Sequence, residues 1–151
     1  MGIAIEGILN CHSVSRLIDF PRMYEEKQGL IWEEIFQFPN SRCESVVWRR
    51  YAPMDDDVHH IGIEREGLIT KSRRPEMRYV GFVSAAVGPI RLVQTPGNHG
   101  FCVTHAPEEG QHHAHICYAP ADGNLQSLKR AEKQDLKLRL RSLFGELVRR
   151  A

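Results

Sequence analysis

The chain has 151 residues, of which 42% are hydrophobic and 26% are charged, and its formal net charge at pH 7 is +1. This composition is typical of a soluble globular protein, and the length predicts a single domain over residues 1–151. A charge so close to neutral excludes a strong overall attraction to nucleic acid or to a membrane surface.

No stretch approaches the length of a membrane-spanning segment, and the first residues lack the basic and apolar regions of a secretion signal. The chain contains four cysteines, too few in a protein of this size to require a disulfide framework. We therefore expect a cytoplasmic protein with reduced thiols.

The first part of the chain predicts one strand and one helix. Isoleucine and leucine alternate weakly with polar residues, which indicates a strand over residues 2–10. Asp19-Phe20-Pro21 offers the carboxylate cap and early proline of a helix start. A broken apolar stripe then continues to residue 38, and Pro39-Asn40 is expected to end the helix.

Between Cys43 and Pro120 the sequence predicts a succession of strands. Short runs of alternating residues occur at 44–51, 58–65, 78–86 and 90–95. The predicted fold class is therefore α+β: a mostly antiparallel sheet of five or six strands, with an N-terminal helix and a C-terminal amphipathic helix packed on it. Short strands with regular turns would also allow the sheet to curl toward a barrel.

Two loops in this region carry groups that can bind ligands. Asp55-Asp56-Asp57 precedes His59-His60 and so combines oxygen and nitrogen donors, but neighbouring aspartates are also common in a solvated turn, which we favour. The basic loop Lys71-Ser72-Arg73-Arg74-Pro75 can contact a phosphate, although so small a cluster usually only faces solvent.

The segment from Gly100 to Tyr118 holds four of the eight histidines and two of the four cysteines. It has the pattern of a hairpin, with two alternating arms separated by a turn over residues 106–110. Pairing the apolar residues of the arms sets Phe101 opposite Ile116 and thus Cys102 opposite His115. One face of the hairpin would then carry Cys102, His113, His115 and Cys117.

These side chains predict a transition-metal site, because imidazole and thiolate together suit zinc. Two alternatives stay open. The residues can be ordinary core or surface residues, since neither Cys-x-x-Cys nor His-Glu-x-x-His spacing is present. Alternatively, His113 and His115 can act as a metal-free acid and base, because histidine titrates near neutral pH. The absence of a carboxylate at short fixed spacing to orient them disfavours catalysis, since Glu108 and Glu109 are expected in solvent.

Gly110-Gln111 followed by His113-Ala-His115-Ile-Cys117 resembles the His-x-His-x-His signature of the histidine-triad nucleotide hydrolases and transferases. The resemblance implies that His115 would attack a phosphate. Here Cys117 occupies the third histidine position, the spacing from the Gly-Gln pair is shorter, and a turn replaces the preceding helix. The resemblance is confined to this segment and does not assign the chain to the family.

The C-terminal segment predicts an amphipathic helix. Asp122 or Asn124 can cap it, and leucines at helical spacing run from Leu125 to Leu147. Its opposite side is basic and could bind nucleic acid or another acidic partner, and the width of the leucine stripe would allow a homodimer contact. Most such helices merely cover a sheet.

The sequence favours a small binding or interaction protein with a His/Cys metal site, whose partner is an unidentified small molecule or protein. The alternative is a hydrolase that acts on a phosphoester, either a nucleotide or RNA. Such an enzyme would use a metal ion or the acid–base chemistry of His113 and His115. An arginine such as Arg49 or Arg91 would then bind the phosphate.

Overall fold

The computed structural model describes residues 4–150. Its main sheet has six strands in the order β6-β7-β4-β1-β5-β8, and each neighbouring pair is antiparallel. The strands are β1 (Ser13–Phe20), β4 (Glu44–Trp48), β5 (Arg78–Ala86), β6 (Gly100–His105), β7 (His113–Ala119) and β8 (Val148–Arg149). The α+β class and the antiparallel sheet are confirmed, but the sheet stays open and does not close into a barrel.

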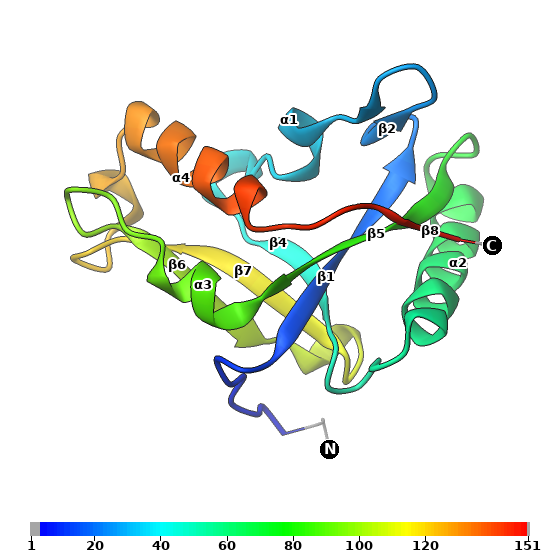
Figure 1. Cartoon of the computed structure of the whole chain (residues 1–151), viewed down its shortest axis with the longest axis horizontal. Helices are drawn as coiled ribbons and strands as arrows, with labels where there is room; N and C mark the ends of the chain where they lie inside the picture. Colours follow the sequence, from blue (N-terminus) through cyan, green and yellow to red (C-terminus); the bar gives the residue numbers. More distant parts are fainter. Residues whose placement is uncertain (1–3, 151) are drawn as a thin grey trace.

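Four α-helices accompany this sheet within residues 4–150: α1 (Trp32–Ile35), α2 (Asp55–Ser72), α3 (Val87–Leu92) and α4 (Arg130–Ser142). A small separate hairpin pairs β2 (Tyr24–Glu25) with β3 (Gly29–Leu30). In Figure 1, α1 and α4 lie together above the sheet, whereas α2 stands apart from them beside β5 and β8. None of the helices in the described part of the chain is long and apolar enough to cross a membrane.

Alternation along the strands divides the buried apolar side chains between the two faces of the sheet. Val46 and Ile116 belong to a large core that also contains Leu136 and Leu140 of α4. We call their side of the sheet the covered face. Val47 of β4 and residues next to it pack instead in a smaller cluster with α2, and we call that side the α2 face.

The C-terminal part of the chain forms helix α4, which is shorter than the leucine pattern suggested. Leu136 and Leu140 are fully buried, so α4 packs its apolar stripe on the covered face. Asn124 does not cap it; its side chain accepts a hydrogen bond from the Gln126 N–H and caps a 3-10 turn at Leu125–Ser127. The chain then leaves the helix, and Val148 becomes part of edge strand β8.

The predicted N-terminal strand and helix are wrong. Residues 4–12 form no strand, and residues 2 and 3 of the predicted strand lie outside the described part. Asp19 is the penultimate residue of strand β1 and does not start a helix, and the helical stretch before residue 38 is limited to α1. The physical reason is that β1 lies in the middle of the sheet, where Val14 and Ser15 are both fully buried on opposite faces, so no clear alternation marks it as a strand.

The predicted strand at 58–65 lies within helix α2, and the one at 90–95 overlaps the end of helix α3. The isoleucines and valine that suggested strand alternation in 58–65 lie on a helix. Asp55-Asp56-Asp57 is its first turn, where the carboxylates oppose the positive end of the helix dipole. The Asp57 carboxylate also accepts a hydrogen bond from the Met54 N–H at 2.9 Å. The aspartates thus start a helix and do not form a separate loop.

Candidate functional site: a groove between α2 and the sheet

The predicted hairpin exists as β6 and β7, but its register differs from the predicted one by two residues. Cys102 lies opposite Cys117, Thr104 opposite His115, and Phe101 opposite Tyr118. Phe101 and Tyr118 stack with their ring centroids 5.7 Å apart, which favours this register over the predicted pairing of Phe101 with Ile116. A shift of two residues leaves every side chain on its predicted face.

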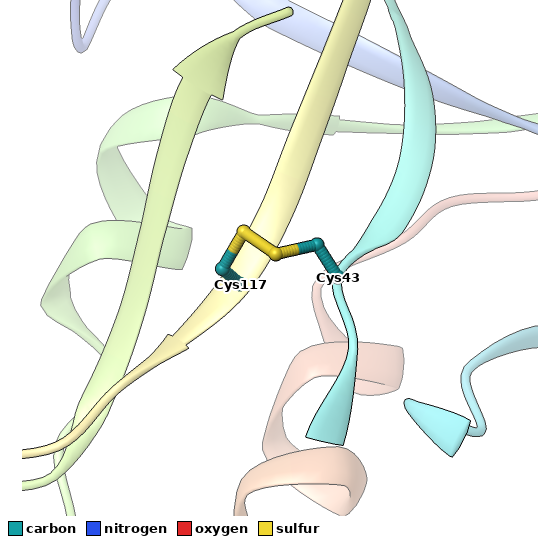
Figure 2. Close-up of a disulfide and its surroundings, with 2 residues drawn as sticks. All are labelled: Cys43 and Cys117. Atoms are coloured by element: carbon teal, nitrogen blue, oxygen red, sulfur yellow. A yellow bond between two sulfur atoms is a disulfide. The ribbon is translucent and has the colours of Figure 1, made fainter. Parts of the chain in front are cut away.

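The metal ligands predicted from the sequence therefore share the α2 face, but they do not form one cluster. Cys117 is joined by a disulfide to Cys43, which lies just before β4, with 4.4 Å between the two Cα atoms (Figure 2). The expectation of reduced thiols is wrong for these two cysteines, whereas Cys11 and Cys102 are free. The Cys117 sulfur is thus already bonded to that of Cys43. Cys102 lies opposite Cys117 and not, as predicted, opposite His115.

Two other groups of metal-binding side chains lie together within residues 4–150. One comprises Cys43, His115 and Cys117, and the other Glu109, His113 and His115. In each group the donor atoms lie within 4.8 Å of one another. Cys102 belongs to neither group, and His115 is shared by both.

His113 is held at the start of β7 by groups from the preceding turn. Its Nδ1 lies 3.1 Å from the Ala106 carbonyl oxygen, and its Nε2 lies 2.8 Å from a carboxylate oxygen of Glu109. The approach of Glu109 is not aligned as a hydrogen bond, so Nε2 has no hydrogen-bond partner. The His113 side chain is 12% exposed and that of Glu109 68% exposed.

The close approach of the Glu109 carboxylate to His113 is a contact that the sequence prediction missed. We expected Glu109 in solvent, and most of its side chain is exposed, but the turn at Pro107–Glu109 brings its carboxylate back onto His113. The signal was present in the sequence as a spacing of four residues, which the sharp turn converts into a contact.

A cavity of about 470 Å³ lies between α2 and the α2 face of the sheet. We call this cavity the groove. Its volume falls within the range of small-molecule sites. Apolar side chains of the strands and of α2 make up part of its lining. The charged groups come from β1, from α2 with the residue that follows it, and from the turn before β7, while the imidazoles lie just before and at the start of β7. The residues used below are Leu17, Val47, Glu64, Arg65, Arg73, Glu109, His112 and His113.

One end of the groove adjoins a cluster with surplus positive charge. Asp19, at the end of β1, is nearly inaccessible, with its side chain 1% exposed. Its Oδ2 lies 3.7 Å from Arg74, 3.8 Å from Arg65 and 3.9 Å from Arg22. One carboxylate cannot neutralise these guanidinium groups, and burial, opposed by Asp19, lowers the pKa of Arg65.

The polar atoms of this arginine cluster are incompletely paired. Neither carboxylate oxygen of Asp19 has a hydrogen-bond partner, and the buried Nε of Arg22 has none either. Arg65 belongs to this cluster and also lines the groove, where the exposed Arg73 lines it too. Positive charge therefore gathers where Arg65 and Arg73 line the groove.

The other end of the groove carries imidazoles. Burial lowers the pKa of His112, and the neighbouring His113 lowers it further, while Glu64 acts in the opposite direction. Burial and His113 also lower the pKa of His115, which lies on the same face of the sheet but does not line the groove. These rings are consequently held neutral at neutral pH, in the form that can accept a proton or bind a metal.

The arginines predicted to bind a phosphate do not line the groove. Arg49 donates hydrogen bonds to the Ala52 carbonyl and to the Ser15 hydroxyl, and Arg91 donates to Asn10 and to the Val103 carbonyl. Arg65 was missed because its segment was predicted to be a strand. Arg73 lies in the predicted basic loop and does reach the groove.

Comparison of the chain with protein-family models, with curated proteins and with solved structures gives no match. The function must therefore be inferred from the groove itself. Its arrangement combines guanidinium groups at one end, a Glu109-contacted His113 at the other, and an apolar lining between them.

Proposed function

We propose that the protein binds a small phosphorylated molecule in the groove, with a mononucleotide as the best-fitting class. The observation that carries this proposal is that Arg65 and Arg73 line the same cavity of about 470 Å³ as the apolar residues between α2 and the sheet. Such a cavity suits a ligand with an anionic end and an apolar or aromatic body.

The charge distribution favours one orientation of the ligand. Guanidinium groups bind phosphate oxygens in a two-point geometry, so the phosphate would lie at Arg65 and Arg73. Glu64 and Glu109 line the remainder of the groove and would repel an anion there. The uncharged part of the ligand would therefore lie over Leu17 and Val47 and point toward His112 and His113.

The binding test is calorimetric titration with adenosine 5′-monophosphate, with adenosine as the ligand that lacks the phosphate. We expect the nucleotide to bind and adenosine to bind at least about tenfold more weakly, a difference of about 1.4 kcal/mol. Arg73→Ala should remove a similar part of the affinity, since the exposed Arg73 side chain lines the groove.

Arg78→Ala is the matched control, because Arg78 is also exposed but donates only to backbone carbonyls of Pro75 and Met77. It should leave the affinity unchanged. Equal binding of the nucleotide by wild-type protein and by Arg73→Ala would remove the groove from consideration as the phosphate site.

A second candidate function is hydrolysis of the bound phosphoester, which the Glu109–His113 contact favours. A carbonyl oxygen only accepts hydrogen bonds, so the contact with Ala106 fixes the proton on His113 Nδ1. Nε2 is buried behind the Glu109 carboxylate, so the exposed Glu109 side chain would first have to move aside and admit a water. Nε2 could then accept a proton from that water, and the nearby carboxylate would stabilise the imidazolium that forms. This role requires the phosphoester to lie at His113, so it competes with the orientation proposed above, in which the phosphate lies at Arg65 and Arg73.

The catalytic candidate is tested with an aryl phosphodiester that releases a coloured phenol. His113→Asn should lower the rate by roughly 10²–10⁴-fold, and Glu109→Gln should lower it less. His60→Asn is the control, since His60 is an exposed residue of α2 that does not line the groove. Turnover that survives His113→Asn would rule out this role and leave the binding function to be judged separately.

A further inference from the structure

We propose that reduction of the Cys43–Cys117 disulfide creates a zinc site formed by the two cysteine sulfurs and His115. This site is distinct from the groove, because none of the three residues lines it. The inference therefore does not depend on which ligand the groove binds, and it replaces the ligand set predicted from the sequence.

The positions of the three donors are set by the pairing of β4 with β7. Glu44 lies opposite Ile116 and Ser45 opposite His115, so Cys43 and Cys117 are the next facing pair. Their Cα atoms are 4.4 Å apart, and Figure 2 shows the side chains bridging the two adjacent strands. His115 precedes Cys117 by two residues and therefore projects from the same face. The sheet thus holds all three side chains in place whether or not the sulfurs are bonded.

The donor distances are compatible with one metal ion. The donor atoms of Cys43, His115 and Cys117 lie within 4.8 Å of one another. Tetrahedral zinc, with Zn–S bonds of about 2.3 Å and Zn–N bonds of about 2.0 Å, requires donors roughly 3.5 Å apart. Small side-chain rotations after reduction would reach this geometry without a shift of the strands.

The chemistry of the donors favours zinc over harder cations. Two thiolates and one imidazole are ligands that zinc prefers, whereas magnesium and calcium require oxygen donors. Three protein ligands leave a fourth position for water. Cys43 is exposed and His115 and Cys117 are half-buried, so both a reductant and the ion can reach the site from solvent.

The switch is chemically balanced. A small dithiol transfers two electrons and two protons to the sulfur–sulfur bond, which breaks into two protein thiols, and the dithiol becomes a cyclic disulfide. Binding of Zn²⁺ as a dithiolate then releases these two protons to solvent. Reoxidation of the protein would expel the metal, since a disulfide sulfur is no longer a thiolate ligand.

The test titrates Co²⁺, as a coloured substitute for Zn²⁺, into oxidised and into phosphine-reduced protein whose folding has been verified by circular dichroism. We expect one cobalt per chain with a thiolate-to-metal charge-transfer band in the reduced protein only, and displacement of cobalt by zinc. Cys43→Ser and Cys117→Ser should abolish the band, and His115→Ala should weaken binding at least about tenfold. His115→Ala retains the disulfide and so separates metal binding from folding.

Two controls decide whether these residues form the site. Cys11→Ser removes an exposed free thiol elsewhere and should leave binding unchanged. Glu109→Gln should also leave it unchanged. Equal binding by oxidised protein, no binding by folded reduced protein, or loss with Glu109→Gln but not with Cys43→Ser would each overturn the proposal. The last result would assign the ion to Glu109, His113 and His115.

Discussion

The two faces of the sheet differ in chemistry even though neighbouring residues of one strand supply both. On the covered face, Ala114 and Ile116 of β7 are fully buried. On the α2 face, His113, His115 and Cys117 of the same strand are only half-buried. In β7, one set of alternate residues therefore packs in the core, and the other set carries the imidazole and sulfur groups.

The two faces differ because the helices cover more of one face than of the other. The core of the covered face includes residues of α1, α3 and α4. The cluster on the α2 face includes Val58 of α2 with Val47 and Phe82, which leaves much of β7 and β6 outside it. The side chains of His113, His115 and Cys117 stay partly accessible there, although Nε2 of His113 is buried without a hydrogen-bond partner.

The sharpest test of this comparison replaces adjacent residues of β7. Ile116→Ala should lower the free energy of unfolding by about 2–5 kcal/mol, because the fully buried side chain leaves a cavity. His115→Ala, one position away on the other face, should cost less than about 1 kcal/mol. Urea denaturation of both variants in the absence of metal measures the difference. Similar losses would show that the two faces contribute equally to stability.

The disulfide is the one place where we expect the α2 face to contribute strongly to stability. It closes a loop with a sequence separation of 74 residues, so Cys43→Ser should lower the free energy of unfolding by roughly 2–4 kcal/mol. Cys102→Ser, which removes the free thiol facing Cys117, should have an effect below about 1 kcal/mol. Denaturation of reduced wild-type protein should reproduce the Cys43→Ser value; an unchanged value after reduction would contradict the prediction.

The contact of α2 with the sheet is tested by two glycines of the same helix. A Cβ atom on Gly62 would lie 2.4 Å from the ring of Tyr79, so Gly62→Ala should push the helix outward and cost about 1–3 kcal/mol. Gly67 faces open space, and Gly67→Ala should stabilise the helix by up to about 1 kcal/mol. Thermal denaturation distinguishes these opposite signs. Two variants of equal stability would mean that α2 is not closely packed on Tyr79.

The smallest expected effect concerns pH and the imidazole end of the groove. Burial and His113 hold the pKa of His112 in the folded chain below the ordinary 6.5, and Glu64 opposes them only partly. The unfolded chain therefore takes up the proton first as the pH falls. The stability that results is fully present above about pH 6.5 and is lost as the pH falls through the folded pKa. In urea denaturation at successive pH values, His112→Asn should lose less stability on acidification than the wild type; a steeper loss would contradict the assigned sign.

The sequence alone was sufficient for the elements whose pattern is local. Strands β4 and β5, the two arms of the hairpin and the apolar stripe of α4 were all predicted. In each of them the apolar residues recur at the spacing of a strand or of a helix. It also placed Cys102, His115 and Cys117 on one face, since the register error of two residues preserves side-chain direction.

Only the tertiary structure decided the features that depend on distant segments. Strand β1 is buried on both faces, so its sequence shows no alternation from which it could be predicted. Residues 58–65 alternate like a strand but form part of helix α2, which packs on the sheet. The pairing of β4 with β7 selects Cys43 as the partner of Cys117, and the docking of α2 brings Arg65 and Arg73 into one groove with His113. Local periodicity records which side of an element is buried, but it contains no information on what that side is buried against.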